Sequence, residues 1–149
     1  MKKSSFTFIF VLIATMTFAQ KSIIKTDQAP NPIGPYSQAV EANGLVFVAG
    51  QIGLNPETRQ LAAGGVEAET AQIMENIKAI LRAANLSMDN IVNTTIYIKD
   101  LSGFPKVNEV YGKYFTGNFP ARATVGADNL PGGAGVEIAV IAVRGPRKK

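Results

Sequence analysis

The hydrophobic pattern is clearest near the C-terminus, where residues 136–143 read Val-Glu-Ile-Ala-Val-Ile-Ala-Val and contain one charged residue, Glu137. Such a run is typical of a β-strand that is buried on both faces. Burying an ionised carboxylate there is costly unless a cation or several hydrogen bonds stabilise it. Arg122 is the nearest candidate partner, because it lies in a strand-like segment, residues 119–126, a hairpin's distance upstream. If the two strands pair, the acid and the guanidinium meet on one face, and the plainest interpretation of that contact is a structural ion pair.

The rest of the pattern predicts an α+β fold. Asn43-Gly44 is a strong hairpin signal between two strand-like runs. Apolar residues at helical spacing predict a helix over residues 67–84 and a second helix that Ser102 caps and whose apolar stripe begins at Phe104. The predicted strands are residues 22–26, 36–41, 45–50, 93–99, 119–126 and 136–143.

Two helices are enough to cover one face of a mixed sheet, which leaves the second apolar face of the last strand without a cover. For a protein in water, identical subunits are the simplest cover for such a face. We therefore expect a closed homo-oligomer whose clefts lie between subunits. The pattern alone does not choose between a dimer and a trimer.

The composition excludes several kinds of chemistry. The chain has 149 residues, 46% of them hydrophobic, and contains no Cys and no His, so a single domain with its own core is expected. Without these two residue types there is no Cys-His or Ser-His-Asp nucleophile system, no disulfide and no zinc site of the usual kind. No Gly-rich phosphate-binding motif occurs either. Catalysis would have to use carboxylates, Arg, Lys, Tyr, hydroxyl groups, backbone groups or water.

The N-terminal segment has the pattern of a secretory signal. Lys2 and Lys3 precede an apolar run that ends at Ala19 and is too short to span a bilayer as a stable helix. We predict cleavage after Ala19 and export to the periplasm or the medium, with residues 20–149 as the mature domain; an uncleaved membrane anchor and a buried helix are the alternatives. Removing residues 1–19 takes away two lysines and no acids, so the net charge falls from +4 to 4 − 2 = +2. This weak positive charge does not favour binding to nucleic acid.

Four motifs follow one another along the chain: Gly-Pro-Tyr-Ser-Gln-Ala at 34–39, Val-Phe-Val-Ala-Gly-Gln at 46–51, Pro-Ala-Arg-Ala at 120–123 and Val-Glu-Ile at 136–138. In this order and spacing they resemble the RidA/YjgF family, the reactive-intermediate (imine/enamine) deaminases. The resemblance implies a chorismate-mutase-like α+β subunit and a homotrimer with three sites in clefts between subunits. It implies hydrolysis of 2-imino acids or their enamine tautomers, such as 2-iminopropanoate and 2-iminobutanoate, to 2-oxo acids and ammonia. No metal and no organic cofactor are implied.

The resemblance also implies roles for single residues. Arg122 falls on the family's carboxylate-binding arginine, and a planar guanidinium can hold a carboxylate through two parallel hydrogen bonds. Glu137 falls on the acid that holds and polarises the attacking water. Tyr36 matches a pocket tyrosine, and its alternative role is that of a half-buried aromatic residue in a strand.

Further positions correspond to contacts with the substrate. Gly50 and Thr124 match positions where backbone groups touch it, and Asn108 matches a pocket asparagine or is a solvated residue of the second helix. Ala49 stands where many members have serine, and Ala139 stands where many repeat a glutamate. These departures leave the expected reaction class in place but bear on the rate and the preferred substrate.

Two other functions stay open from the residues alone. A non-catalytic module could use Arg122 to hold small carboxylate ligands, in line with Ala49 and with export. Ribonuclease or translation-inhibitor activity occurs among relatives of the family, but the weak positive charge of the mature chain and its expected export speak against it.

Overall fold

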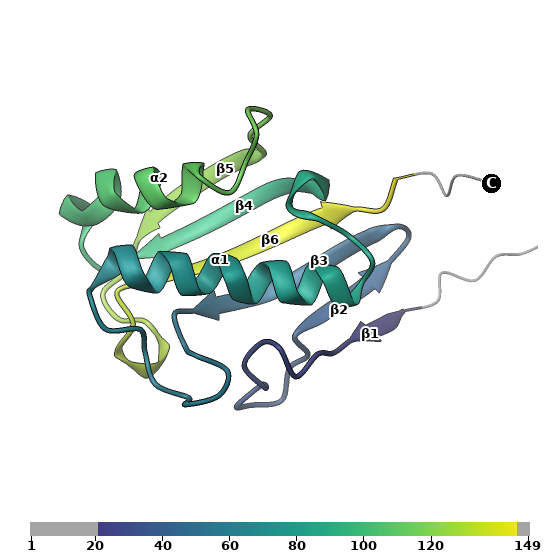
Figure 1. The fold of residues 1–149 in the computed structure, drawn as a ribbon, viewed down its shortest axis with the longest axis horizontal. Coiled ribbons are helices and arrows are strands. Elements are labelled where there is room, and N and C mark those ends of the chain that lie inside the picture. The colour runs from purple at the N-terminus through teal and green to yellow at the C-terminus, as the bar shows by residue number, and fades with distance from the viewer. Residues whose placement is uncertain (1–20, 146–149) are drawn as a thin grey trace, which may run out of the picture.

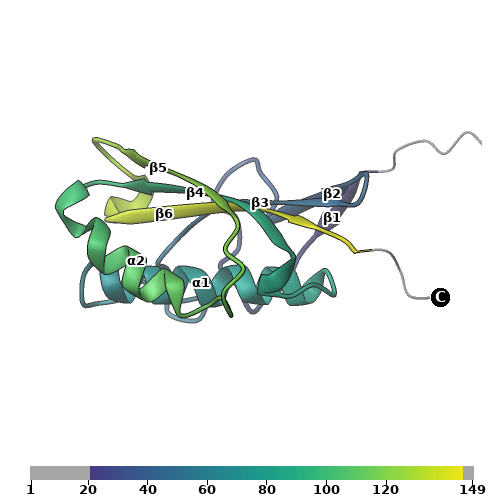
Figure 2. The ribbon, with the colours of Figure 1, turned by 90° about the horizontal axis from the view of Figure 1, so that it is seen from above.

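The computed structural model describes residues 21–145 as one six-stranded sheet with two helices on one of its faces (Figures 1 and 2). The strands are β1 (Ser22–Ile24), β2 (Ala39–Ala42), β3 (Leu45–Ile52), β4 (Ile91–Ile98), β5 (Ala121–Gly126) and β6 (Val136–Val143). The helices are α1 (Val66–Ala83) and α2 (Phe104–Gly112), and short 3₁₀ turns lie at Met88–Asn90, Leu101–Gly103 and Pro131–Gly133. The prediction of an α+β fold with a mixed sheet and two helices on one face is confirmed.

The order of the strands is β1-β2-β3-β6-β4-β5, and only the β4–β5 pair is parallel. The predicted pairing of the last two strands is therefore wrong, because β6 lies between β3 and β4 while β5 lies at the far edge. A strand that is apolar on both faces belongs at the centre of a sheet. The parallel pairing of β4 with β5 in turn needs a crossover, which α2 supplies.

The core lies between the sheet and the helices. Residues of β6 alternate: Val136, Ile138, Val140 and Ala142 are buried towards the helices, whereas the residues between them, Glu137 included, lie on the other face and are less buried. We call this second face the open face. In one copy of the chain β6 is thus fully covered on one side only, and the expectation of a covering oligomer stays a prediction.

Local signals explain two of the connections. The β2–β3 hairpin turns at Asn43 and Gly44, whose φ angles of 52° and 75° suit the tight hairpin turn that the sequence predicts. The start of the second helix differs from the prediction, because α2 follows Gly103 and has no side-chain capping hydrogen bond. Asp100 instead caps the short turn before it: its carboxylate accepts from the backbone N–H of Ser102 at 2.9 Å. A 3₁₀ turn follows and leads into α2.

The predicted N-terminal signal, residues 1–19, lies outside the residues that the structure describes. Within the described part, neither helix has the length and apolar character that a bilayer-spanning helix requires.

Candidate functional site

Glu137 lies on the open face near the beginning of β6, between Ile52 of β3 and Tyr97 of β4. Its carboxylate sits directly against the backbone of Gly50: a Cβ atom at residue 50 would overlap with Oε1 of Glu137 and lie 2.8 Å from its Cδ. Burial raises the pKa of the Glu137 carboxyl above its ordinary value. Among residues 21–145, no hydrogen bond or ion pair holds this carboxylate. Glu137 is thus a partly desolvated acid without a hydrogen-bond or ion-pair partner among the described residues, and its carboxylate is available to water or a ligand.

A β-bulge brings Gly50 to this position. The register between β3 and β6 shifts between Val48 and Gln51. Gln51 is buried, and its Nε2 donates to the carbonyl oxygen of Ala49 at 3.0 Å, which holds the bulge in shape. Bulges often redirect side chains next to functional sites. Here the bulge places a residue without a side chain beneath the acid.

The loop between β1 and β2 lines a cavity on the side opposite Glu137. The side chain of Gln38 is buried and makes four hydrogen bonds to backbone groups of this loop. Its Nε2 donates to the carbonyl oxygens of Thr26, Ala29 and Pro30 at 2.9, 3.2 and 3.0 Å, and its Oε1 accepts from the N–H of Thr26 at 2.8 Å. One side chain therefore fixes the path of the loop that leads to Tyr36.

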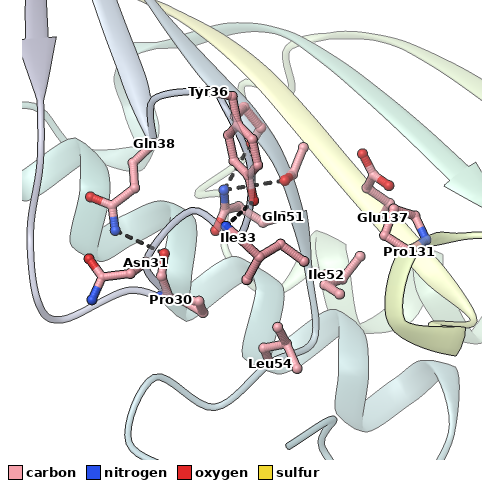
Figure 3. Close-up of a pocket in the computed structure, with 12 residues that line it drawn as sticks. Pro30, Asn31, Ile33, Tyr36, Gln38, Gln51, Ile52, Leu54, Pro131 and Glu137 are labelled. Carbon is pink, nitrogen blue, oxygen red and sulfur yellow. Dashed lines mark hydrogen bonds between the residues drawn. The ribbon is translucent and has the colours of Figure 1, made fainter. Parts of the chain in front are cut away.

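The acid pocket, as we call the cavity lined by Tyr36, Gly50 and Glu137, has a volume of about 390 Å³ (Figure 3). The structure thus brings together three of the residues predicted from the sequence. Figure 3 shows Ile33 and Tyr36 on one side of the cavity and Glu137 on the other. The hydroxyl oxygen of Tyr36 accepts from the N–H of Ile33 at 3.4 Å, and the ring is half exposed.

Arg122 lies elsewhere, on the helix face at the β5 edge of the sheet. It is in register with Thr94 of β4, and its Cζ is 4.9 Å from the centroid of the Tyr111 ring of α2. Together with Asn108 and Phe119 it lines a shallow cavity of about 450 Å³, which we call the arginine hollow. Burial raises the pKa of Tyr111, an effect that its hydrogen bond to Thr94 and the charge of Arg122 oppose.

The predicted ion pair between Arg122 and Glu137 is wrong. The two residues point to opposite faces, and β4 separates their strands. Their register partners on β4, Thr94 and Tyr97, are three residues apart, which adds about 10 Å along the strand to about 10 Å across two strand spacings. The acid pocket and the arginine hollow are therefore separate within one copy of the chain.

The remaining predicted residues divide in the same way. Asn108 lines the arginine hollow with Arg122. Thr124 follows on β5, half-buried and opposite Ile96, and lines neither cavity. In the part of the chain that the structure describes, no cluster of Asp and Glu residues is arranged to hold a metal ion.

Sequence reasoning missed two kinds of site residue. Gln38 and Gln51 build the walls of the acid pocket, and the available signal was a polar residue inside an apolar strand pattern. Pro131 lines the same pocket from the turn before β6, although nothing in its local sequence distinguishes it from an ordinary turn proline.

Comparisons with known proteins agree with this fold. A family model described as endoribonuclease L-PSP matches residues 26–144. The RutC family protein of Pyrococcus horikoshii is 45% identical over 124 residues, which make up 83% of this chain and 98% of that protein. The 2-iminobutanoate/2-iminopropanoate deaminase of Mus musculus is 45% identical over 126 residues, 85% of this chain and 93% of that protein. The crystal structure of E. coli TdcF with bound serine is 40% identical, has a TM-score of 0.80, and matches over 83% of this chain and 99% of that chain.

The fold and the two cavities define an α+β protein that carries an acid and an arginine on separate faces of one sheet. This chain belongs to the endoribonuclease L-PSP family, which is the RidA/YjgF family indicated by its motifs.

The prediction of a secretory signal and of export is wrong. The family match begins at residue 26, and the region of similarity covers 98% of the archaeal relative from Pyrococcus horikoshii. The family relationship therefore gives no support to a periplasmic or secreted protein. A short apolar run after two lysines is a pattern of composition, and it does not define a destination by itself. Cleavage after Ala19 is therefore not retained.

Proposed function

We propose that this protein is a hydrolytic deaminase of reactive 2-imino acids and their enamines, such as 2-iminopropanoate and 2-iminobutanoate, which it converts to 2-oxo acids and ammonia. One observation carries the proposal: the carboxylate of Glu137, which no residue between 21 and 145 pairs with, lies against Gly50 in the wall of a pocket and has a raised pKa. A raised pKa makes the carboxylate a stronger base, which suits it to accepting a proton from water. The relationship to the mouse 2-iminobutanoate/2-iminopropanoate deaminase supports the choice of substrate.

The proposed reaction is the addition of water to a C=N bond. Glu137 orients a water molecule and accepts a proton from it as the oxygen attacks the imine carbon. Glu137 passes this proton to the nitrogen of the resulting carbinolamine and the C–N bond breaks. The hydroxyl proton of the carbinolamine returns to the Glu137 carboxylate as the carbonyl of the 2-oxo acid forms and ammonia leaves. A protonated imine is already electrophilic, so a positioned water and one carboxylate suffice.

Arg122 binds the carboxylate of the substrate in this proposal, with Asn108 beside it and with backbone groups of Gly50 and Thr124 in contact with the substrate. Tyr36 closes the other side of the pocket. Because the acid pocket and the arginine hollow are separate within one copy of the chain, the complete site is proposed to join them across the boundary between two copies of a homotrimer. The partly exposed apolar residues on the open face are consistent with such packing.

The chemistry is tested by imine hydrolysis with purified protein. An amino-acid oxidase generates the imine, and semicarbazide competes for it, so the enzyme lowers the yield of semicarbazone. We expect acceleration by the wild type and a strong loss of turnover in Glu137→Gln, with 2-oxo acid binding and assembly preserved. Unchanged turnover in a correctly assembled Glu137→Gln protein would refute the role of this acid.

The shared site is tested by mixing two inactive variants, Glu137→Gln and Arg122→Ala. If each site takes its acid and its arginine from different copies, co-assembly in equal amounts restores about a quarter of the wild-type sites, because each intact half is present with a probability of about one half. No recovery after verified subunit exchange would place both residues in one copy. Light scattering that finds only monomers at micromolar concentration would also contradict the proposal.

A second candidate function is a small-ligand binding module without catalysis. The related E. coli TdcF structure holds bound serine, and this observation favours a site that recognises a small carboxylate. The two candidates differ in one result: a binding module retains affinity for 2-oxo acids and gives no acceleration of imine hydrolysis in the wild-type protein.

A further inference from the structure

The guanidinium of Arg122 rests on two aromatic rings. Its Cζ lies 4.9 Å from the centroid of the Tyr111 ring and 5.5 Å from that of the Phe104 ring. Both rings come from α2, seven positions apart, and therefore lie on the same side of the helix. Both distances fall within the range of cation–π contacts.

Arg122 has no acid as a partner in the described chain. The ion pairs found between residues 21 and 145 all involve other cations, Lys78, Lys106, Lys113 and Arg144. No side-chain hydrogen bond of Arg122 to another described residue is present either. Rings rather than a carboxylate therefore determine where this cation lies, and its N–H groups stay free to meet a ligand.

Tyr111 is itself fixed in place. It is only 3% exposed, and its hydroxyl lies 3.0 Å from the hydroxyl of Thr94, which is fully buried. Thr94 is the residue of β4 in register with Arg122. The Tyr111 ring also packs on Phe115, with 4.8 Å between ring centroids. The ring is thus held by β4, the strand next to the arginine, and by Phe115.

We propose that Phe104 and Tyr111 form an aromatic seat that positions Arg122 to bind the substrate carboxylate. The two rings act through Arg122 and are positioning residues. The seat holds the guanidinium by contacts that consume none of the N–H groups needed for a bidentate carboxylate contact. A protein acid in the same place would compete with the ligand for those groups. The inference rests on the proposed role of Arg122 as the carboxylate-binding residue.

The competing explanation is that Arg122 only shields two rings at the edge of the sheet, since arginine stems often cover apolar surface. The two explanations differ in what the loss of a ring does to ligand binding. If Arg122 only shields the rings, the loss of a ring changes stability alone. If the rings position Arg122, the loss of a ring lowers the affinity for the ligand, and it has no further effect once Arg122 itself has been replaced.

The experiment measures the affinity of the full-length, assembled protein for 2-oxobutanoate by calorimetry, together with KM and kcat for imine hydrolysis. The variants are Phe104→Leu, Phe104→Tyr, Arg122→Lys and the Phe104→Leu/Arg122→Lys double variant. We expect Phe104→Leu to weaken binding and raise KM by about three- to tenfold, as for a lost cation–π contact, with little change in kcat. Phe104→Tyr keeps a ring and should restore affinity to within about twofold of the wild type. Phe104→Met serves in place of Phe104→Leu if the latter fails to assemble.

Val107→Ala is the matched control for packing. Val107 is fully buried on the same helix and is not one of the two rings over Arg122. This variant should lower thermal stability while leaving affinity for 2-oxobutanoate unchanged. An equal loss of affinity in Val107→Ala and Phe104→Leu would assign the effect to α2 packing and overturn the seat.

The double variant separates the possible failures. If the seat acts through Arg122, the double variant binds no more weakly than Arg122→Lys alone. Affinity losses that multiply in the double variant would contradict the inference. Normal affinity in Phe104→Leu together with weakened affinity in Arg122→Lys would also contradict it. Both results leave the proposed function intact. Normal affinity in Arg122→Lys would instead remove the carboxylate-binding role on which the proposed function depends.

Discussion

The acid pocket and the arginine hollow are built in different ways. The acid pocket depends on backbone geometry: a bulge places Gly50 beneath Glu137, and the amide of Gln38 holds the loop that leads to Tyr36. In the arginine hollow, the rings of Phe104 and Tyr111 contact the arginine, and one hydroxyl pair ties Tyr111 to the sheet. We infer that changes to main-chain geometry will damage the acid first, whereas changes to ring packing will damage the arginine first.

The largest effect is expected from Gly50→Ala. The new Cβ would overlap with Oε1 of Glu137, so the carboxylate must leave its position. Positioned proton transfer contributes about 10²- to 10⁴-fold to a typical enzymatic rate, and kcat for imine hydrolysis should fall by about 10²-fold or more. Gly145→Ala is the control, because a Cβ at residue 145 has open space around it. Near wild-type turnover of an assembled Gly50→Ala protein would mean that the acid works from another position.

Arg122→Lys tests whether the arginine hollow binds the carboxylate of the ligand. A lysine keeps the charge but cannot offer two parallel N–H groups to a carboxylate. The affinity for 2-oxobutanoate should fall by roughly 30-fold, which corresponds to about 2 kcal/mol for a lost charge-assisted pair. Arg82→Lys, at the exposed end of α1, is the matched control and should bind normally. An unfolded or dissociated Arg122→Lys protein with no selective effect on binding would favour a structural role for Arg122.

The free energy of unfolding should also differ between variants of the acid pocket and variants of the arginine hollow, although these effects are smaller. Gln38→Leu leaves backbone carbonyls of the Tyr36 loop without a donor, and the free energy of unfolding should fall by roughly 1–3 kcal/mol. Thr94→Val removes the single hydrogen bond that holds Tyr111 of the arginine hollow to β4 and should cost about 1 kcal/mol. Urea titrations of the two variants decide the point. A larger cost for Thr94→Val would show that the hydroxyl pair, and not the amide, is the more important polar anchor.

The sequence pattern was enough to predict the elements and the family. Alternating and helical periodicity marked the strands and both helices, and Asn43-Gly44 marked its hairpin, because these signals are local. The order of the strands depends on contacts between segments that are far apart in the sequence. Two strands that follow each other in sequence can pair or can be separated by a third strand, and the apolar pattern of β6 indicated a central position without naming its neighbours.

The candidate site shows a similar limit. Tyr36, Gly50 and Glu137 were predicted from motifs and do line one pocket. The supposed contact between Arg122 and Glu137 failed because it depended on strand pairing and on which face each side chain occupies. A shift of one residue or the insertion of one strand changes both, and neither is visible in the spacing of two charged residues. The aromatic partners of Arg122 also come from a distant helix, so no local pattern connects them to the arginine.

The smallest expected effect concerns Glu137 and links function to stability. Burial raises the pKa of Glu137 in the folded protein above its ordinary value of 4.5. A carboxyl group with a raised folded pKa binds its proton more tightly in the folded state, so its favourable contribution is complete below pH 4.5 and is lost as the pH rises through the folded pKa. Glu137→Gln removes the charge that is disfavoured at neutral pH. The variant should therefore be less active but slightly more thermostable than the wild type at pH 7.

Thermal melts from pH 4 to pH 8 check this prediction. The stability gain of Glu137→Gln should shrink as the pH falls towards the ordinary carboxyl value of 4.5, because the wild-type acid then becomes neutral as well. Over the same range, wild-type turnover should decline as the pH falls through the raised pKa, since the protonated acid cannot accept a proton from water. Tyr97→Phe, an uncharged change at the register neighbour of Glu137 on β4, should show no such pH-dependent gain. A gain of equal size at every pH would attribute the effect to packing on the open face and not to the charge of the acid.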